Sequence, residues 1–396
     1  MFTFAINWYN AERRYILAKF FFWLTLIILF CIYLGYPLLI SILAVFFRES
    51  HKIDEDYLPE VTLLVPAYNE ADVIADKIAN IFNLDYPKGK FNAVILVDQS
   101  TDRTEEIVRS LVKDNLSMWV QSPRQGKTAA LNYFAAKAKG EIIIFSDANS
   151  MYQPDAIGKL VRHFKNQSIG LVCGDLKFIT SDTLVSLGES FYWSYEKFLK
   201  KKESALHQLL VVNGSIYAIR KKLFSSVAFD LADDFVLPMR ISAAGYGLIY
   251  EPEAINREKV STTARDQFQR KVRITAQGIK ASFSMLGVIF KSSAVRIMEF
   301  FMHKFLRWFA FVPIILMFIA NCFLLDLILY RIIFLLQVIF YFFALLGYIF
   351  QRNGRYVKIF FVPFYFTLVN FACFRGFLDF LFSKNKAMWE KAGSTR

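Results

Sequence analysis

The chain has 396 residues, 43 of them phenylalanine, and a mean hydropathy of +0.35, values that exclude an ordinary soluble protein and argue against a single domain. We therefore expect part of the chain to lie in a membrane. The formal net charge of +13 is compatible with nucleic-acid binding, but the sequence has no nucleic-acid-binding motif, so we expect the basic surface to face anionic lipid headgroups and phosphorylated substrates.

A long uncharged run near the N-terminus predicts the first membrane helix. No charged residue occurs between Lys19 and Arg48, and this run is long enough to cross the roughly 30 Å hydrocarbon core despite Pro37. It is too long for the core of a signal peptide, and no small-residue cleavage site follows it. We expect an uncleaved anchor, followed by a polar linker over residues 50–59.

Short apolar strands, each followed by polar residues and a helix start, recur after this linker. The runs are 61–65, ended by Pro66; 93–97, ended by Asp98; a strand near Trp119; and 142–145, followed by Ser146 and Asp147. Alternation of strands and helices is typical of a largely parallel sheet with helices on both faces. The sequence therefore predicts an α/β, Rossmann-like domain that binds a nucleotide.

Two of these strand ends carry residues suited to a phosphorylated ligand. Gly126 lets the backbone approach a ligand closely, while Arg124 and Lys127 place positive charge at a helix start, although only G-K-T of a P-loop is present. Asp147 and Asn149 follow the fourth strand, where oxygen ligands could hold Mg²⁺ or Mn²⁺. The alternative for this second stretch is a simple Asx turn.

Three further uncharged runs near the C-terminus predict about three more membrane helices. They cover 308–325, 332–351 and 359–374, the last extended to Phe382. Arg375 and Asp379 in this extension are four residues apart and can pair on one helix face. Before these runs, Lys271, Arg273 and Lys280 precede the apolar stretch 283–290, which favours an interfacial amphipathic helix or, alternatively, a helix packed on the domain.

We accordingly divide the chain into four regions. They are residues 1–48, a tail and a transmembrane helix; 49–281, a cytoplasmic domain; 282–306, an interfacial segment; and 307–396, transmembrane helices and a tail. Four crossings would put both tails outside, although each tail is basic and the positive-inside rule favours the cytoplasm. The basic residues are Arg13 and Arg14 in one tail and Lys384, Lys386, Lys391 and Arg396 in the other. Either the rule is overridden or one span is re-entrant.

The cysteines and histidines are scattered, and they predict neither a disulfide framework nor a zinc site. They are Cys31, Cys173, Cys322, Cys373, His51, His163, His207 and His303. We assign the histidines no role, and the cysteines suit a reducing cytoplasmic setting.

Four motifs in order resemble the signatures of family 2 glycosyltransferases of the GT-A fold. They are P-A-Y-N-E (66–70), V-D-Q-S-T-D (97–102), R-Q-G-K-T-A-A-L-N (124–132) and S-D-A-N (146–149). The match continues through V-N-G-S-I-Y-A-I-R (212–220), A-D-D-F-V (232–236), G-Y-G-L-I-Y-E-P-E-A (245–254) and Q-F-Q-R-K-V-R (267–273). One leading and several trailing spans are similar to the membrane-embedded branch that includes cellulose, hyaluronan and poly-N-acetylglucosamine synthases.

The resemblance implies a donor site for a nucleotide sugar. By this resemblance Pro66, Tyr68 and Glu70 line the nucleoside site, and Asp98 contacts the base or ribose. Lys127, Gln267 and Arg270 complete the donor-binding set, with Arg270 suited to neutralise diphosphate charge. The family habit is a uridine nucleotide.

The metal and the base are implied in the same way. Asp147 binds the metal on the diphosphate, and Asn149 stands where the family has Asp, so we expect weaker cation binding or a further ligand elsewhere. Asp234 is the expected base for the acceptor hydroxyl, with Asp233 beside it to raise its pKa. The alternative for this pair is the N-cap of a helix over 235–244.

The residues expected near the acceptor match the motifs of the family less well than those of the donor site do. Lys271 replaces the Trp of the Gln-x-x-Arg-Trp motif of processive synthases, which weakens the expectation of processive synthesis. Trp193, Tyr195 and Glu196 lie between the metal and base motifs and are candidates for acceptor contacts, with core packing as the alternative.

These residues predict an inverting, metal-assisted glycosyltransferase that extends a polysaccharide at the cytoplasmic face of the cell membrane. A transferase that adds one sugar to a lipid-linked acceptor is the first alternative. A transporter or membrane scaffold with a transferase-like domain is the second.

Overall fold

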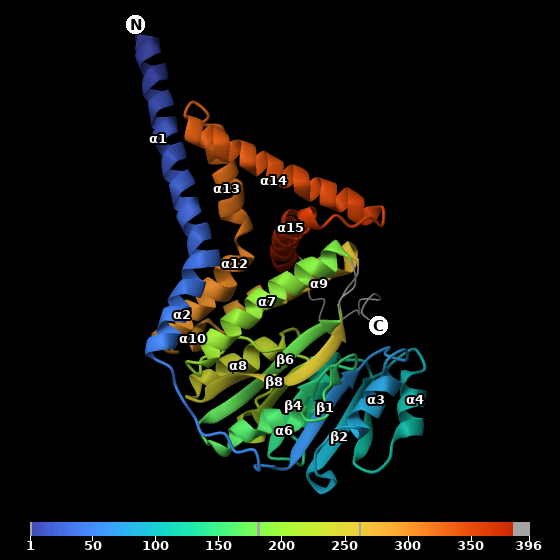
Figure 1. Cartoon of the computed structure of the whole chain (residues 1–396). Helices are drawn as coiled ribbons and strands as arrows, with labels where there is room; N and C mark the ends of the chain where they lie inside the picture. Colours follow the sequence, from blue (N-terminus) through green and yellow to red (C-terminus); the bar gives the residue numbers. More distant parts are fainter. Residues whose placement is uncertain (1, 180–182, 261–262, 383–396) are drawn as a thin grey trace.

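The structure, a computed structural model, describes residues 2–179, 183–260 and 263–382. An α/β domain lies below a group of long helices, and the first helix points away from it toward the N-terminus (Figure 1). The basic tail residues Lys384, Lys386, Lys391 and Arg396 lie outside the described residues.

The α/β domain is built on one eight-stranded mixed sheet with the order β3-β2-β1-β4-β7-β6-β8-β5. The strands are β1 Val61–Ala67, β2 Phe91–Asp98, β3 Leu116–Gln121, β4 Ile142–Ser146, β5 Met151–Tyr152, β6 Ile169–Ile179, β7 Ile216–Arg220 and β8 Gly247–Lys259. Strands β1 to β4 are parallel, β7 is antiparallel to both β4 and β6, and β5 is antiparallel to β8. The predicted α/β class and the parallel half are confirmed.

Helices cover both faces of this sheet because side chains alternate along the buried strands. Leu63 and Val65 of β1 pack toward α3, α4 and α6, whereas Leu64 packs toward α5 and α8. These helices are α3 Ile74–Phe82, α4 Thr104–Leu111, α5 Lys127–Ala135, α6 Ala156–Val161 and α8 Asp233–Ala243. The parallel strands thus present their carboxyl ends at one shared edge, with helix starts beside them.

The helices outside the domain include three that are long and apolar enough to cross a membrane. They span Arg13–Phe46, Ile328–Arg352 and Lys358–Phe382. The first is continuous through α1 Phe2–Phe30, the π-helix Cys31–Gly35 and α2 Tyr36–Phe46, with Pro37 in the first turn of α2. The expectation of membrane helices is therefore confirmed by length and composition.

The predicted crossing at 308–325 does not form as one helix. Helix α13, Phe311–Cys322, has only 12 residues, and the segments Ala294–Trp308 and Phe311–Cys322 meet at 60°. Pro313 lies in the first turn of α13, where its missing N–H leaves no helical bond unmade. This region is a broken span or a re-entrant loop.

The segment before it is also more broken than predicted. Helix α9, Ala264–Ser284, runs past the predicted boundary at 281 and then ends. Met285 and Ile289 pack into the core on the α5 and α8 side of the sheet. The chain therefore changes direction at the end of α9. Short helices follow: α10 Leu286–Ile289, α11 Ala294–Glu299, a π-helix Phe300–Phe305 and α12 Leu306–Trp308.

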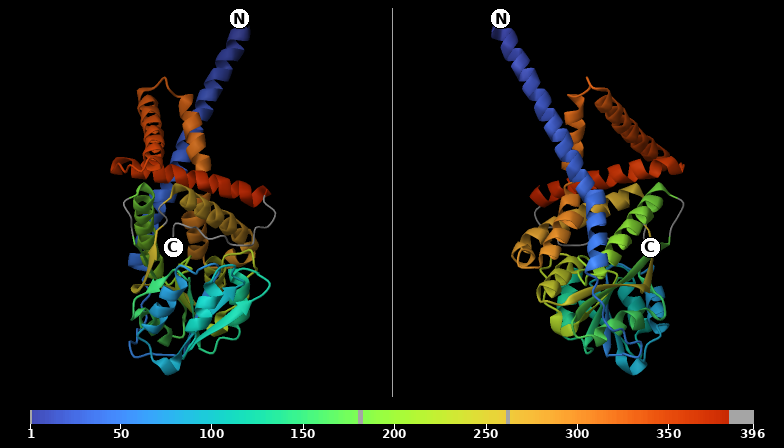
Figure 2. Two further views of the ribbon diagram at one scale, coloured as in Figure 1. Left: turned by 90° about the vertical axis from the view of Figure 1, so that its right-hand side faces the viewer. Right: turned by 60° about the vertical axis from the view of Figure 1, so that its left-hand side comes forward.

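Helix α15, Phe361–Phe382, runs crosswise to α13 and to α14, Ile328–Arg352 (Figure 2). It lies between those helices and the pair α7, Leu184–Ser204, and α9. Arg375 and Asp379 pair on α15 as predicted, at 3.0 Å. Gly376 faces α9 so closely that a Cβ there would stand 2.7 Å from the carbonyl oxygen of Val272.

Replacing Gly376 by alanine is expected to loosen this helix pair, because a backbone carbonyl cannot turn aside as a side chain can. Overpacking of this kind costs about 1–3 kcal/mol, which lowers the melting temperature by a few degrees. The measurement is thermal unfolding in detergent. Gly287→Ala is the matched control, since nothing lies within 4 Å of its added Cβ. Equal melting temperatures for the two variants would contradict the predicted contact.

Three buried glutamates on α7 join the α/β domain to the surrounding helices. Glu189, Glu196 and Glu203 are spaced by seven residues and so share one helix face. Glu189 pairs with Lys271 of α9 at 3.1 Å and accepts a hydrogen bond from Tyr365 of α15. Glu196 pairs with Arg307 at 2.5 Å and Lys304 at 2.9 Å, and Glu203 accepts from Tyr36 of α2 at 2.6 Å.

His303 lies between two of these glutamates, although the sequence indicated no role for it. Its Nδ1 lies 2.5 Å from Glu203, its Nε2 lies 3.2 Å from Glu196, and its ring stacks on Tyr36. The carboxylates are thus matched by cations and hydrogen-bond donors from α2, α9, α15 and the segment 300–308, as buried charges require.

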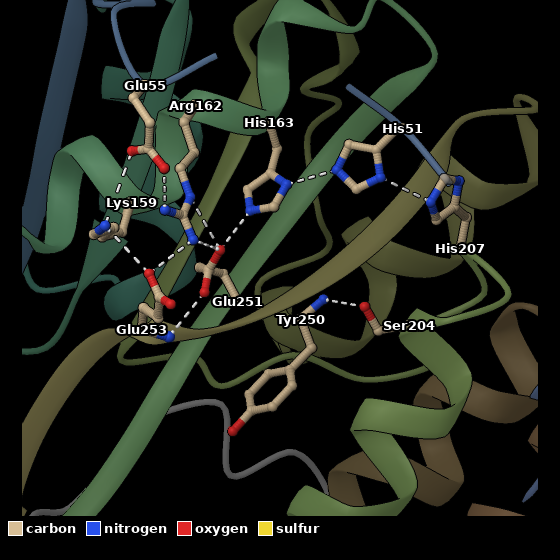
Figure 3. Close-up of polar contacts among 10 residues, drawn as sticks. All are labelled: His51, Glu55, Lys159, Arg162, His163, Ser204, His207, Tyr250, Glu251 and Glu253. Atoms are coloured by element: carbon tan, nitrogen blue, oxygen red, sulfur yellow. Dashed lines mark hydrogen bonds and ion pairs between the residues drawn. The ribbon is translucent and has the colours of Figure 1, made fainter. Parts of the chain in front are cut away.

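The other three histidines fix the segment that leads from α2 to β1 (Figure 3). His51 bridges His163 and His207, with nitrogen distances of 2.6 Å and 3.0 Å. His163 in turn contacts Glu251 at 2.7 Å, and His207 contacts Glu49 at 2.9 Å. Within the described residues no group of three or more His, Cys, Asp or Glu side chains could hold a metal ion, so this cluster is a hydrogen-bonded chain.

Acid is expected to weaken this attachment. Burial and the neighbouring His163 and His207 lower the pKa of His51 to about 4, whereas an unfolded histidine titrates near about 6.5. Between these values the unfolded chain binds a proton that the folded chain does not, so stability falls as the pH drops from about 6.5 toward about 4. The surrounding charged groups are Glu49, Glu55, Lys159, Arg162, Glu251 and Glu253.

The measurement compares melting temperatures at pH 7.5 and pH 5 for the unchanged protein and for His51→Gln. We expect the variant to be the less stable protein at pH 7.5 but to lose less stability on acidification. An identical loss in both proteins would show that His51 does not carry this dependence.

Candidate functional site

The loops after β1 and β2 are tied together at the carboxyl edge of the sheet. Asn69, in a left-handed conformation with φ of 53°, donates its backbone N–H to Ser100 Oγ and accepts from the N–H of Thr101 at 2.8 Å. The backbone N–H of Glu70 donates to Thr104 Oγ1 at 2.7 Å. These bonds place Pro66, Tyr68 and Glu70 of the first motif beside the second motif, as the proposed nucleoside site requires.

Asp98, at the end of β2, organises the loop that leads into α5. Its Oδ1 accepts from the N–H of Gln125 at 3.0 Å and its Oδ2 from the N–H of Gly126 at 2.9 Å. Gly126 has a φ of 93°, a conformation that favours glycine. Asp98 is 3% exposed, so in this structure it holds a loop, and its contact with a base or ribose stays a prediction.

Arg124 in the same loop lies over the ring of Tyr68, 3.5 Å from the ring centroid. Its backbone N–H donates to Gln99 Oε1 at 2.7 Å. The first and third motifs therefore share a wall made of an aromatic face and a guanidinium group, a surface suited to a planar base or an anion.

Lys127, the first residue of α5, forms an ion pair with Asp147, which follows β4. The Nζ to Oδ1 distance is 2.6 Å, and the Asp147 side chain is 37% exposed. Burial lowers the pKa of Lys127, but Asp147 and Asp233 more than offset this and hold it above its usual value. Asp147 is thus an accessible carboxylate that already attracts a cation.

Asp233 and Asp234 form the first turn of α8 and lie inside the helix, with Ala232 at the N-cap position. The Tyr217 hydroxyl donates to Asp233 Oδ2 at 2.5 Å. Asp234 lies against Gly214, where an added Cβ would stand 2.9 Å from Asp234 Oδ2. Burial and the charge of Asp233 raise the pKa of Asp234 to about 6, which suits a group that takes a proton near neutral pH.

Arg273 of α9 completes the charged cluster. Burial and the neighbouring Arg270 lower the pKa of Arg273 to about 10, while Asp234 and Asp147 oppose that shift. One electrostatic cluster therefore joins Asp147, Lys127 and Asp234 to α9. The cluster combines carboxylates that can hold a cation or a proton with cationic side chains that can hold a diphosphate.

Gln267 is engaged in packing in this structure. It is fully buried, and its Nε2 donates to Glu189 at 2.5 Å and to the Tyr365 hydroxyl at 3.1 Å. Lys271, one turn further on, pairs with Glu189 and lies 4.3 Å from the ring centroid of Tyr192. These contacts join α9 to α7 and α15.

The three acceptor candidates on α7 also make packing contacts. Trp193 Nε1 donates to the carbonyl of Leu176 at 2.8 Å, and the Tyr195 hydroxyl donates to the carbonyl of Tyr33 at 3.2 Å. Glu196 belongs to the buried stripe of glutamates described above. Their acceptor role stays a prediction, and the packing alternative accounts for the contacts seen.

Two residues near the cluster were not predicted from the sequence. Tyr217 of β7 reaches Asp233, and Lys77 of α3 is fully buried beneath the loop that carries Asp147. Lys77 could have been noticed because it shares an apolar helix stripe with Ile74, Ile78 and Ile81. A lysine in such a stripe is rarely buried without partners.

Residues 62–227 match the family model of glycosyl transferase family 2. The chain therefore carries a family 2 glycosyltransferase domain. The match contains the first four motifs and ends just before Asp233 and Asp234.

The curated relatives of this transferase have different stated products. A probable glycosyltransferase, YdaM, of Bacillus subtilis is 28% identical over 70% of this chain and 69% of its own length. The poly-β-1,6-N-acetyl-D-glucosamine synthase of Staphylococcus aureus is 24% identical over 58% and 57% of the two chains. A β-monoglucosyldiacylglycerol synthase of Nostoc is 28% identical over 57% and 51%. The chain thus spans little more than half the length of these two synthases.

Among solved structures, a mannosyltransferase, PcManGT, from Pyrobaculum calidifontis, in complex with GDP-Man and Mn²⁺, has a TM-score of 0.70 at 20% identity. The match covers 92% of the transferase and 100% of that chain. At this identity the likeness concerns the fold, and it confirms the predicted GT-A architecture.

Proposed function

We propose that the transferase moves a sugar from a nucleoside-diphosphate sugar to a growing polysaccharide, with inversion at the anomeric carbon, at the cytoplasmic face of the membrane. The observation that carries this proposal is the cluster of Asp147, Lys127, Asp234 and Arg273 at the carboxyl edge of the sheet. It offers a cation site, a diphosphate site and a base in one place.

The metal would bind at Asp147 and Asn149. Both side chains are half-buried oxygen donors at the end of β4, and the ion pair of Asp147 with Lys127 supports a place for positive charge there. Two protein ligands suffice for Mg²⁺ or Mn²⁺ when phosphate oxygens and water supply the rest. When bound, the metal supplies positive charge that stabilises the diphosphate leaving group.

The remaining negative charge of the diphosphate would be offset by side chains of the protein. Lys127 and Arg273, with Arg270, would offset the negative charge that the leaving diphosphate gains, and the charges of Lys127 and Arg273 already act on those of Asp147 and Asp234. Asp234 takes the proton of the attacking acceptor hydroxyl. The acceptor oxygen then attacks the anomeric carbon directly, on the face opposite the leaving group, and this direct attack gives the inverted product.

The polysaccharide product is favoured by the name of the Staphylococcus aureus relative, and a second candidate is a single addition to a lipid acceptor. Lys271, held by Glu189 and Tyr192, stands where the resemblance expects a Trp, and the Nostoc relative is named for a glycolipid product. Both candidates use the same donor site, so they differ only in whether further sugars are added after the first transfer.

Product sizing tests the two candidates. The purified protein is incubated with labelled nucleotide sugars, beginning with UDP and GDP derivatives, and the products are separated by length. A ladder of lengthening chains supports the polysaccharide proposal. A single added sugar overturns it in favour of the lipid acceptor, and the absence of transfer from every donor contradicts the donor assignment.

The crosswise direction of α15 bears on orientation in the membrane. We propose that α15 lies along the cytoplasmic surface and does not cross, with α1–α2, the broken span made of Ala294–Trp308 and Phe311–Cys322, and α14 as the crossing elements (Figure 2). The chain then returns to the side of the α/β domain, which satisfies the positive-inside rule for the loop 352–358. Protease access to a tag at the C-terminus, from each side of the membrane, tests this arrangement, because an α15 that crossed would put that end on the outside.

A further inference from the structure

Lys77 of α3 is a fully buried lysine that the proposed chemistry does not use. It lies on the apolar stripe by which α3 packs on the sheet, next to Ile78. Burying an ammonium group is costly unless hydrogen bonds and opposite charge compensate it. Its surroundings therefore indicate what it stabilises.

All the described partners of the Lys77 ammonium belong to one short segment. Its Nζ donates to Ser146 Oγ at 2.8 Å and to the carbonyl oxygen of Ser150 at 2.5 Å, and it lies 4.4 Å from the ring centroid of Tyr152. Ser146 ends β4, and Ser150 directly precedes β5. Lys77 thus joins the two ends of the loop that carries Asp147 and Asn149.

The same loop is tied to the opposite side of the site by buried polar groups. Ser150 Oγ donates to Glu258 Oε1 at 2.5 Å, and Asn256 donates to Glu258 at 2.9 Å and to Ser215 Oγ at 3.1 Å. Ser215 follows Gly214, the residue against which Asp234 lies. A hydrogen-bonded network therefore runs from α3, beneath the loop, to Ser215, the sequence neighbour of Gly214.

Charge supports the same conclusion. Burial lowers the pKa of Lys77 to about 7, and the charges of Asp147 and Glu258 oppose that shift, so one acid of the loop and one of β8 offset part of the cost of burying the ammonium. Removing the ammonium would leave Ser146, Ser150 and Glu258 short of a donor or a counter-charge.

We propose that Lys77 is a positioning residue that holds the Ser146–Ser150 loop, and with it Asp147 and Asn149, in the geometry that receives the metal and the diphosphate. The part of this inference that concerns the metal rests on the function proposed above. The part that concerns the loop does not.

The test uses the full chain in detergent and two variants of α3. Lys77→Met keeps the length of the side chain and removes the ammonium. Ile78→Ala is the matched control, because Ile78 is equally buried on the same helix but packs into the apolar core. Hydrogen–deuterium exchange of residues 146–152 reports on the loop, and Mn²⁺ titration by electron paramagnetic resonance with UDP or GDP reports on the metal.

We expect Lys77→Met to speed exchange over 146–152 and to weaken Mn²⁺ binding in the presence of nucleotide by about 10–100-fold, as for other residues that orient metal ligands. Ile78→Ala should lower the melting temperature without either effect. Where Lys77→Met does not fold, Ser146→Ala, which removes one acceptor of Lys77 and the hydrogen bond from Ser146 Oγ to the Asp147 carbonyl, is expected to give the same two changes to a smaller degree.

Unchanged exchange over 146–152 in the variant that folds would overturn the proposal. Faster exchange together with no Mn²⁺ binding by the unchanged protein would support the loop role of Lys77 and contradict the metal role of Asp147. The failure of the inference and the failure of the proposed function are therefore distinguished.

Discussion

Replacing Asp234 by asparagine is expected to lower kcat for sugar transfer by about 10²–10⁴, the usual contribution of a positioned general base. Asparagine has nearly the same shape and keeps the first turn of α8, but it cannot take a proton. Binding of the nucleotide should change little, because the nucleoside loops are held by Asp98 and Asn69 and not by Asp234. Initial rates with a labelled donor, beside nucleotide binding by calorimetry, separate the two effects.

The pH profile gives a second test of the same residue. Because the pKa of Asp234 is raised to about 6 by burial and by Asp233, the base is protonated below that pH and kcat should fall there. Asp233→Asn is the informative companion, since removing the neighbouring charge should shift this limb to lower pH. Transfer that survives in Asp234→Asn with its profile intact would rule out Asp234 as the base.

Replacing Asp147 by alanine is expected to abolish detectable transfer, as is thorough chelation of divalent cations. Asp147 is the single carboxylate of the proposed metal site, so its loss leaves only the amide oxygen of Asn149. Mn²⁺ titration in the presence of nucleotide measures the binding directly. Transfer should return when Mg²⁺ or Mn²⁺ is restored to the chelated protein and should not return in the variant.

Asn149→Asp adds a carboxylate to the proposed metal site, whereas Asp147→Ala removes one. A second carboxylate in the same loop should tighten Mn²⁺ binding, since carboxylates bind hard cations more strongly than amides do. Activity that persists through chelation, or an Asn149→Asp protein that binds Mn²⁺ no better than the unchanged one, would remove the metal from this loop.

The sequence predicted the α/β domain well because its signals are local. Each buried strand is a short apolar run, and the polar residues that end it fall at the carboxyl edge whatever the rest of the chain does. Asp147, Lys127 and Asp234 could be brought together from motif order alone. The pairing of Asp98 with the N–H groups of Gln125 and Gly126 could not, because it depends on how two loops meet.

Long-range partners explain the remaining misses. His51, His163 and His207 are more than 40 residues apart in sequence, so no spacing rule links them, yet the fold brings their rings together in one chain. The partners of Glu196, which are Lys304 and Arg307, lie over 100 residues away in the segment 300–308, so the sequence did not indicate these ion pairs. The break before α13 was not predicted because hydropathy reports the composition of a segment and not the direction of its helix axis.

The stripe of Glu189, Glu196 and Glu203 on α7 has a practical consequence for anyone who wants the domain alone. Their counter-charges and hydrogen-bond donors come from α2, α9, α15 and the segment 300–308, so a shortened chain without the membrane helices would leave buried carboxylates unmatched. Such a shortened chain would either bury these carboxylates without a partner or expose the apolar surface around them. We therefore expect the α/β domain to be obtained in folded form only together with the helices that supply these partners.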